Sequence, residues 1–379
     1  MNRESRYPKE SNNQYIPLFY PSVPPDAVIE VTDTLNSRWI GQGPKVEIFE
    51  SMFSEKFTTN KTCISVGSGT DALHLAYLLA DVEKDSEVLV PVFTCTATNI
   101  PFLYIGAKVK FVDVAKNSLN MDLDDLERKI TSKTAAIVIV NYGGLPVDLD
   151  RLNQIASRYK IPVIQDSAHA IGATYKGKKI ADLTDFSIYS FQAIKHITTG
   201  DGGMLVINNP ELAEKAKRLR WFGIDRTSKL LGVWENDIQD VGFKYQMNDV
   251  SAAMGIAGLK AIDGYLKHRR DLLDAYIQNL RSNESVRIID AEAPGVEHAA
   301  WMFTIRVKNR TKLQSTLLIQ GIESSQVHYR NDRYSIFDGR KSDLPNMDSI
   351  EDEYLVLPLH TKMTESDVER VCSVINGGW

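Results

Sequence analysis

The chain has 379 residues, of which 43% are hydrophobic and 25% charged, and its formal net charge is −5. These values are typical of a folded globular protein and exclude wholesale disorder. The small negative charge gives no electrostatic reason to expect binding to nucleic acid or to an acidic membrane surface. No run of about 18 apolar residues is present, so we predict no transmembrane helix.

The N-terminal segment and the cysteines indicate in which cellular compartment we expect the protein. Residues 1–15 are polar and lack the apolar stretch of a secretory signal, so we expect a loose tail or a partner-binding arm. The three cysteines, Cys63, Cys95 and Cys372, are widely scattered. This pattern favours a reducing cytoplasm over a disulfide framework or a zinc site.

The first two thirds of the chain alternate between two kinds of segment. Residues 26–36 and 44–57 predict helices, and the glycine-punctuated stretch between them predicts a loop. Short apolar runs, typical of strands buried on both faces, lie at 62–66, 87–93, 108–114, 135–142, 161–166, 186–191 and 203–208. Helical stretches lie between most of them, at 70–80, 96–105, 122–130 and 149–160. The alternation predicts an α/β domain with a mainly parallel sheet flanked by helices.

The pattern changes after residue 246. Residues 246–280 have helical periodicity throughout, with Gly255 and Gly264 as expected bends, and such a helix can bridge a large and a small domain. The remainder mixes short strands such as 302–308 with helices at 311–320 and 364–375, which predicts a small α+β domain. We therefore predict a polar tail at 1–15, a large α/β domain at 16–250, and a linking helix with a small C-terminal domain at 251–379.

One glycine-rich turn, residues 67–71 (Gly-Ser-Gly-Thr-Asp), follows a predicted strand and opens a helix. Backbone amides at a helix N-terminus form an anion cradle, so the turn could hold a phosphate. The alternative is an ordinary strand-to-helix turn in which Ser68 or Thr70 caps the helix. The Lys-Ser/Thr ending of a nucleotide-binding P-loop is missing.

Two further residues could carry chemistry. Asp166 closes the predicted strand 161–166, and a carboxylate at the end of a parallel strand points into the crevice where ligands bind. It could hold a protonated ring nitrogen, or it could simply cap a helix. Lys195 follows another strand and precedes a glycine-rich turn. A lone lysine is usually a solvated charge, but a partly desolvated one can form a Schiff base with a carbonyl cofactor.

Together these residues match what pyridoxal phosphate requires. Its phosphate would sit on the helix N-terminus, Asp166 would keep the pyridine nitrogen protonated, and Lys195 would hold the aldehyde. The ordered motifs extend this match over most of the chain: residues 37–44, 68–75, 90–98, 106–114, 166–173, 190–203 and 242–253. From about residue 15 to the end, the sequence resembles the DegT/StrS-type family of pyridoxal-phosphate-dependent nucleotide-sugar aminotransferases, of fold type I.

The resemblance implies roles for individual residues. Lys195 would be the Schiff-base lysine and proton shuttle, and Asp166 would pair with the pyridinium nitrogen. Ser68, Gly69, Thr70 and Ser190 would hold the phosphate. His169 stands where the family often has Gln or Glu, near the hydroxyl of the cofactor ring, and its role is open.

At two other positions the chain departs from the family pattern. Where the family usually stacks an aromatic residue on the cofactor, this chain has Cys95, with Phe93 two residues earlier, and either could cover the ring. Where the family commonly has an Asn that reaches the phosphate from the partner subunit, this chain has Lys244. A lysine could do the same as a point charge, or it could be an ordinary solvated loop residue.

The residues that could contact the substrate match the family pattern less specifically than the residues that could bind the cofactor. Positions that loosely match the family's sugar or diphosphate contacts are Trp39, Trp301, His328, Tyr329 and Arg330, and each could equally be a packing aromatic or a surface charge. Trp39 and Lys244 are expected to arrive from the partner in a homodimer with composite active sites. The seven histidines lack ligand spacing, so we expect no metal site.

The function implied by the resemblance is transfer of an amino group from L-glutamate to a nucleotide-linked ketosugar, with pyridoxamine phosphate as intermediate. We favour amination at C4 of a 4-keto-6-deoxyhexose, in the cytoplasm, for an O-antigen, another glycan or an antibiotic sugar. The alternatives are a 3-ketosugar aminotransferase, a sugar dehydratase or a non-catalytic regulatory homologue of the same fold, and an aminotransferase of amino acids. The dehydratase branch has a His in place of the Schiff-base lysine, whereas this chain has Lys195.

Overall fold

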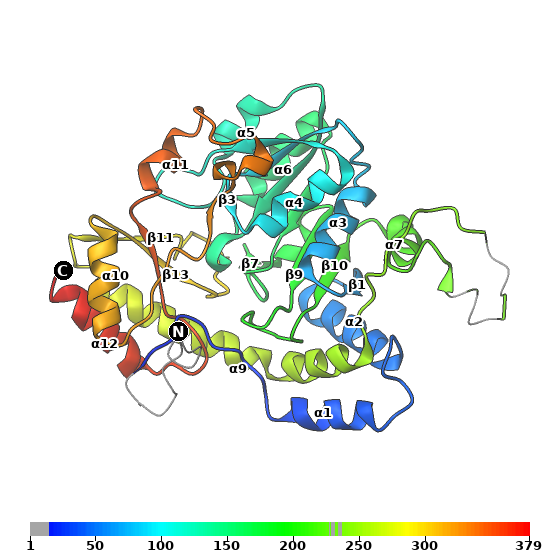
Figure 1. The fold of residues 1–379 in the computed structure, drawn as a ribbon, viewed down its shortest axis with the longest axis horizontal. Coiled ribbons are helices and arrows are strands. Elements are labelled where there is room, and N and C mark those ends of the chain that lie inside the picture. Colours follow the sequence, from blue (N-terminus) through cyan, green and yellow to red (C-terminus); the bar gives the residue numbers. More distant parts are fainter. Residues whose placement is uncertain (1–14, 227, 229–231, 234–236) are drawn as a thin grey trace, which may run out of the picture.

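The computed structural model describes residues 15–379 except 227, 229–231 and 234–236. The predicted polar tail therefore lies, apart from Tyr15, outside the described residues. A seven-stranded sheet forms the centre of the molecule (Figure 1). Its strands, in spatial order, are β1 (Thr62–Val66), β10 (Gly203–Ile207), β9 (Phe186–Ser190), β6 (Val163–Asp166), β5 (Thr134–Val140), β2 (Glu87–Pro91) and β4 (Lys108–Val112).

The pairing of these strands confirms the predicted fold class. From β9 to β4 all neighbours are parallel, and only β10 runs antiparallel to its neighbours β9 and β1. Each predicted apolar run in 62–208 contains a strand, although several strands end one or two residues earlier than predicted. The carboxyl ends of the parallel strands therefore meet at one edge, where ligands bind in sheets of this kind.

Helices cover both faces of this sheet. They are α3 (Gly69–Leu79), α4 (Thr96–Ile105), α5 (Leu123–Lys129), α6 (Leu149–Tyr159) and α7 (Ala213–Arg220), with α1 (Asp26–Leu35) and α2 (Pro44–Phe57) at one end. Successive residues of β2 show the two-sided burial: Val88 and Val90 join the core beneath α3 and α4, whereas Leu89 joins that beneath α5 and α6. A strand buried on both faces needs a continuous apolar run, which is what the sequence shows.

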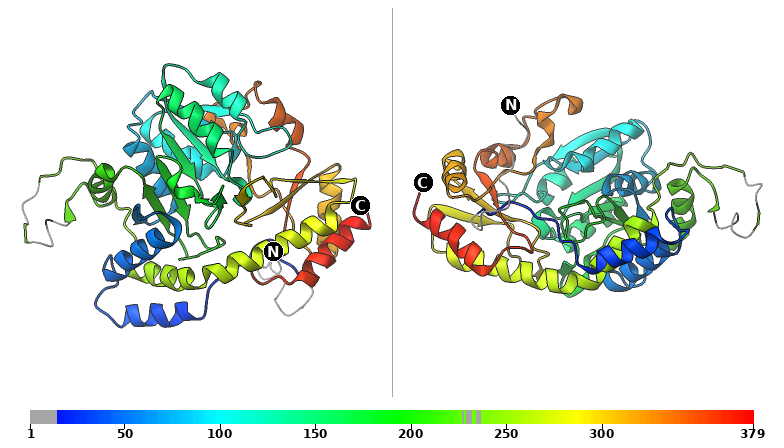
Figure 2. Two further views of the ribbon diagram at one scale, coloured as in Figure 1. Left: turned by 180° about the vertical axis from the view of Figure 1, so that it is seen from behind. Right: turned by 60° about the horizontal axis from the view of Figure 1, so that its bottom comes forward.

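Helix α9 (Asp249–Leu280) links the two ends of the molecule (Figure 2). Its first half packs on α1 and α2, and its second half packs on α12 (Glu365–Asn376). The helix is unbroken through Gly255 and Gly264, the two positions where we expected bends. Gly255 instead makes room for a neighbour: a Cβ there would lie 2.6 Å from the Phe49 ring.

A second, smaller sheet lies toward the C-terminus. Its order is β11 (Val286–Ile289), β13 (Phe303–Val307) and β15 (Tyr354–Leu357), and its neighbours all pair antiparallel. The helices of this region are α10 (Arg310–Ile319), α11 (Pro345–Ile350) and α12. The sheet shares a core with α10, α12 and the second half of α9. The strand and two helices predicted here match to within a residue.

Short elements connect the two sheets near the strand ends. Strand β3 (Phe93–Thr94) pairs with β14 (Tyr329–Arg330), and β12 (Val296–Glu297) pairs with β7 (Thr174–Tyr175), which also pairs with β8 (Lys178–Lys179). The 3₁₀ helices are η2 (Tyr142–Gly144), η3 (Ile180–Asp182), η4 (Pro210–Leu212), η5 (Asn331–Arg333) and η6 (Ser335–Phe337). These contacts bring C-terminal residues to the strand ends. Among the helices that the structure describes, none is long and apolar enough to cross a membrane.

Candidate active site

Asp166 is the last residue of β6 and lies at the carboxyl edge of the central sheet. Its side chain is buried and accepts hydrogen bonds from Thr98 Oγ1 at 2.8 Å and from the Ala168 amide at 3.0 Å. Burial raises the pKa of this carboxyl, while the bonds from Thr98 and Ala168 and the charge of Lys195 oppose that rise. A buried carboxylate in this position is suited to pairing with a cation that arrives with a ligand.

Lys195 lies in the irregular segment after β9, and its Nζ is 3.6 Å from the centroid of the Trp301 ring. The ammonium group is thus held on the face of an aromatic ring by a cation–π contact. Burial lowers the pKa of Lys195 to about 8, although Cys95 and Asp166 favour the charged form. An amine that loses its proton near neutral pH is a nucleophile and a base, which an ordinary surface lysine is not.

Four rings are grouped beside this amine around Trp301 and His169, and we call this group the column of rings. Trp301 stacks on His169 with ring centroids 3.8 Å apart and on Phe19 at 5.4 Å, and its centroid lies 6.2 Å from that of His328. His328 lies parallel to His169 at 5.3 Å. The Trp301 indole N–H donates to the carbonyl of Ile194, which fixes the ring next to the residue preceding Lys195.

The two histidines of this column are neutral near pH 7. Burial, with the charge of Lys195, lowers the pKa of His328 to about 3 and holds that of His169 well below its usual value. One nitrogen of each ring, His169 Nδ1 and His328 Nε2, is buried and has no hydrogen-bond partner among the described residues. Buried polar atoms rarely stay unpaired, so both nitrogens point to a polar ligand.

The glycine-rich turn before α3 forms the predicted anion cradle. Ser68 caps α3 by accepting a hydrogen bond from the Asp71 amide, and Gly69 and Thr70 form the first turn. A Cβ on Gly69 would lie 3.0 Å from that of Ser190, and a Cβ on Gly203 would lie 2.3 Å from the Ser68 carbonyl oxygen. The glycines therefore allow the helix N-terminus, the end of β9 and the start of β10 to approach closely, which suits a phosphate group.

These features fit pyridoxal phosphate. The cradle at Ser68–Thr70 and Ser190 offers amides and hydroxyls, Asp166 is a buried carboxylate, and Lys195 is a weakly basic amine. In the part of the chain that the structure describes, no cation forms an ion pair with Asp166, so a protonated pyridine nitrogen would complete its surroundings.

Two of the predicted site residues need correction. The Phe93 ring is buried and packs edge-to-face against Tyr142 and Tyr354, so it belongs to the core and does not cover a ligand. Cys95, in contrast, is exposed at the N-terminus of α4. Strand β3 ends at Thr94, and Cys95 is the N-cap residue of α4, so its side chain does not continue the face on which Phe93 lies.

The second correction concerns Arg330, for which we expected a contact to the sugar or its diphosphate. Its guanidinium is fully buried and bonds to Asp332 at 2.6 and 2.7 Å, and also to Asp348 and Glu351. With its charge compensated by three carboxylates, this arginine holds β14 in place and has no free group for an anion. The neighbouring Tyr329 is half-buried, and the Arg333 guanidinium lies 4.8 Å from its ring centroid.

Two other predicted residues lie apart from Lys195. Trp39 is 41% exposed in the loop before α2, where the Arg38 guanidinium lies over its ring. Lys244 follows α7 in sequence, and its Nζ lies 4.1 Å from the centroid of the Trp221 ring. Neither residue contacts the column of rings within its own chain.

The sequence analysis did not single out two residues of this site. Thr98 bonds Asp166, and Phe19 covers Trp301. A signal for Thr98 was present, because it is one of three threonines spaced two apart in an otherwise apolar stretch. The sequence contained no such signal for Phe19, because a single aromatic residue in an N-terminal segment is usually a packing residue.

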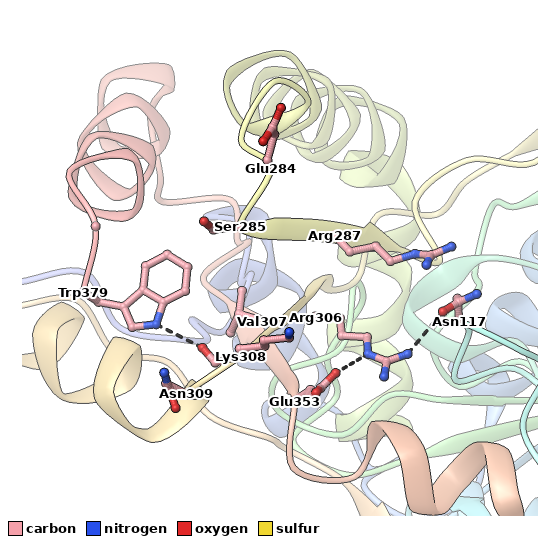
Figure 3. A pocket seen from close by; sticks show the side chains of 11 residues that line it. Asn117, Glu284, Ser285, Arg287, Arg306, Val307, Lys308, Asn309, Glu353 and Trp379 are labelled. Carbon is pink, nitrogen blue, oxygen red and sulfur yellow. Dashed lines mark hydrogen bonds and ion pairs between the residues drawn. The ribbon is translucent and has the colours of Figure 1, made fainter.

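A separate cavity of about 760 Å³ lies on the outer side of the C-terminal sheet (Figure 3). Its lining includes Arg287, Arg306, Lys308, Glu353 and Trp379, but none of the predicted site residues. Arg306 is already paired with Glu353 at 2.5 Å. Within the described residues no group of three His, Cys, Asp or Glu side chains could hold a metal ion.

Comparisons with known proteins agree with this geometry. The model of the DegT/DnrJ/EryC1/StrS aminotransferase family matches residues 24–376. A Campylobacter jejuni protein, UDP-4-amino-4,6-dideoxy-N-acetyl-beta-L-altrosamine transaminase, is 33% identical over 351 residues, which are 90% of this chain and 91% of that protein.

Solved structures are similar over nearly the whole chain. The sugar aminotransferase CalS13 from Micromonospora echinospora has a TM-score of 0.91 and 34% identity, covering 96% of this chain and 100% of that one. Spr1654 from Streptococcus pneumoniae, solved in a PLP form and a PMP form, has a TM-score of 0.90 in both, with 28% and 29% identity, covering 96% of this chain and 98% of that one.

Proposed function

Because the chain belongs to the DegT/DnrJ/EryC1/StrS aminotransferase family and is a pyridoxal-phosphate-dependent sugar aminotransferase, we propose that it moves an amino group from L-glutamate to a nucleotide-linked keto-deoxysugar. The acceptor we propose is a 4-keto-6-deoxyhexose, and the product an aminosugar for glycan biosynthesis. The name of the Campylobacter relative, a transaminase of a UDP-linked 4-amino-4,6-dideoxy sugar, supports an amino group at C4.

Lys195 has the central role in this proposal. When bound, pyridoxal phosphate would supply an aldehyde that accepts the amino group and a ring that withdraws electrons. Lys195 would hold the aldehyde and, as a free amine, would take up the proton from Cα of the amino donor. Its pKa of about 8 means that a useful fraction of the amine is unprotonated near neutral pH, as a general base requires.

The remaining cofactor residues bind and orient. Asp166 would keep the ring nitrogen protonated, which favours the withdrawal of electrons from the reacting carbon. Ser68, Gly69, Thr70 and Ser190 would hold the phosphate at the N-terminus of α3. His169 and Cys95 would lie next to the ring, where His169 offers a neutral imidazole whose Nδ1 has no partner within the described chain.

The position of Lys195 is the single observation that carries the proposal. A half-buried amine with a lowered pKa faces an aromatic column, and the buried carboxylate of Asp166 lies close enough to influence its charge. A solvated surface lysine would have none of these features. The dehydratase alternative would need a different residue at this position, so the observation also favours transamination.

On the substrate side we propose contacts from Trp301, His328 and Tyr329. Trp301 lies beside the amine, where its buried indole would form part of the apolar wall next to the bound sugar. His328 is neutral, so it would exchange a hydrogen bond with a sugar hydroxyl through Nε2 and would not act as a cation for the diphosphate.

We propose a homodimer whose partner chains complete each other's active sites through Lys244 and Trp39. Both residues are exposed on their own chain, where Trp39 packs under Arg38 and Lys244 lies over Trp221. Large apolar side chains are exposed on α1 and in the segments around it and after α7, which an interface would cover. These residues are Val28, Ile29, Leu35, Ile40, Ile48, Ile238 and Val241.

The division of the chain and its location are also proposals. The separate cores of the central and C-terminal sheets support a large region at 16–250 and a linking helix with a small region at 251–379. A cytoplasmic location is supported by cysteines that are free, with Cys63 and Cys372 buried and Cys95 exposed.

A substrate panel tests the function. The purified enzyme, loaded with pyridoxal phosphate, is given L-glutamate and either dTDP-, UDP- or GDP-linked 4-keto-6-deoxyhexoses, the corresponding 3-ketosugars, or simple 2-oxo acids, and 2-oxoglutarate release is followed. We expect the highest kcat/KM with a 4-ketosugar. Preference for a 3-ketosugar would move the amination site, and turnover of 2-oxo acids alone would contradict the proposal. The Lys195→Ala variant serves as the blank.

A further inference from the structure

The carboxylate of Asp166 is joined to two threonine hydroxyls inside the protein. Thr98 Oγ1 lies 2.8 Å from Asp166 Oδ2, and Thr94 Oγ1 lies 2.8 Å from Thr98 Oγ1. Both threonines are buried. The other carboxylate oxygen, Oδ1, accepts from the Ala168 amide.

The number of protons in this chain of oxygens depends on the charge of Asp166. If the carboxylate is ionised, each hydroxyl has one proton and one acceptor: Thr94 donates to Thr98, and Thr98 donates to Asp166. If Asp166 is protonated, three O–H groups share only two contacts, and one proton has no acceptor. Within the described residues Thr94 Oγ1 has no side-chain or carbonyl acceptor other than Thr98. The arrangement therefore favours the ionised carboxylate.

The backbone around both threonines is held firmly, so the hydroxyls cannot easily turn away. The Thr98 carbonyl accepts from the Tyr77 hydroxyl at 2.6 Å, and the Thr94 carbonyl accepts from Asn331 Nδ2 at 2.8 Å. Asn331 is fully buried and is also bonded by Asn99 Nδ2 at 2.9 Å. These bonds tie the pair to α3, on one side, and to the segment after β14, on the other.

We propose that Thr98, oriented by Thr94, is a positioning residue that keeps Asp166 ionised and aimed at the pyridine nitrogen of the cofactor. This inference rests on the proposed role of Asp166. Burial of Asp166 favours its neutral form, and Thr98 supplies the strongest opposing contact. Without that hydroxyl the carboxylate becomes more basic, and the proton shared with the ring nitrogen moves from nitrogen toward oxygen.

The test measures the ring nitrogen directly. Enzyme reconstituted with ring-¹⁵N pyridoxal phosphate is examined by solid-state NMR in the wild type, Thr98→Val and Thr98→Ser. We expect the Thr98→Val resonance to move toward that of neutral pyridine, while Thr98→Ser keeps the wild-type position. For Thr98→Val, kcat/KM for L-glutamate should fall roughly tenfold or more, as expected for the loss of one hydrogen bond to a charged group.

Controls separate this inference from its premise. Thr304→Val removes another buried hydroxyl, one that lies 3.5 Å from Tyr142 Oη, and should leave the resonance in place. A wild-type resonance in Thr98→Val overturns the inference. A wild-type resonance in Asp166→Asn overturns the proposed role of Asp166 as well. If Thr98→Val does not fold, Thr98→Ala is compared with Thr98→Ser, and identical resonances in the two overturn the inference.

Discussion

Lys195 and Lys244 differ in how many neighbouring side chains of the proposed active site their own chain places around them. Lys195 lies over Trp301, within a column of stacked rings and under the influence of a buried carboxylate. Lys244 is exposed and lies over Trp221 in a segment that follows α7, and the next residue, Tyr245, accepts a backbone hydrogen bond from Gly67. The residues proposed to react with the cofactor are thus brought together by one chain, whereas Lys244 and Trp39, proposed to complete the site of a partner, lie on its surface.

Burial accounts for the chemical difference. Desolvation lowers the pKa of Lys195 and of His328, so an amine and two imidazoles are less charged than they would be in water. Lys244 has a different task in the proposal, because a phosphate is best held by a fully charged ammonium. The same residue type would thus act as a base in one place and as a fixed charge in the other.

Among the substitutions that we expect to weaken the enzyme without abolishing its activity, Asp166→Asn should have the largest effect. Removing the only carboxylate proposed for the ring nitrogen leaves a buried cation unpaired, which costs about 3–5 kcal/mol. The L-glutamate half-reaction should therefore slow by roughly two to four orders of magnitude. Single-turnover kinetics of the loaded enzyme measure this loss.

The cofactor-free protein provides the control. Because burial raises the pKa of Asp166, the carboxylate is not stabilised in the native state without a cationic partner. The free energy of unfolding of cofactor-free Asp166→Asn should therefore equal or exceed that of the wild type. A marked loss of stability in urea unfolding would assign Asp166 a structural role instead.

A smaller effect is expected for Lys244→Gln. If Lys244 of one chain holds the phosphate bound to the other, its loss should weaken pyridoxal phosphate binding about tenfold, the value for one charged hydrogen bond. Equilibrium titration of the cofactor-free protein measures the dissociation constant. Lys116→Gln, at an exposed lysine elsewhere in the chain, is the matched control. Equal dissociation constants for the two variants would contradict the proposal for Lys244.

The smallest effect concerns pH and applies to Lys195 alone. Its lowered pKa of about 8 means that the amine is protonated below pH 8 and mostly free above it. The rate at which cofactor-free protein takes up pyridoxal phosphate should rise with pH, reach half its limit near pH 8 and then level off, falling about tenfold per unit on the acidic side. A rate that still rises steeply toward pH 10 would indicate an ordinary lysine. Stopped-flow absorbance follows the uptake.

Local patterns in the sequence were sufficient to predict the central fold. Apolar runs that must be buried on both faces marked the strands of the parallel sheet, and helical periodicity marked α2, α4 and α9. The two-residue strands β7, β8 and β12 were not predictable, because each exists only through pairing with a distant segment. The close packing at Gly255 was not predictable for a similar reason, since it involves the Phe49 ring of another helix.

The site was predictable where a motif fixed the residue. Asp166, Lys195 and the turn at Ser68–Thr70 each have a local signature. The column of rings joins residues 19, 169, 301 and 328, and no local pattern indicates that these rings stack. Arg330 shows the opposite error, because a charge that looks available in the sequence is cancelled by Asp332, Asp348 and Glu351 in the fold.

The most direct test of the account is the absorption spectrum of the purified protein with pyridoxal phosphate, recorded before and after L-glutamate is added. If Lys195 holds the cofactor, the wild type should be yellow, L-glutamate should bleach the yellow band to that of the pyridoxamine form, and Lys195→Ala should lack the original band. A yellow protein that does not respond to L-glutamate would reject that donor. An identical yellow band in Lys195→Ala would contradict the central assignment.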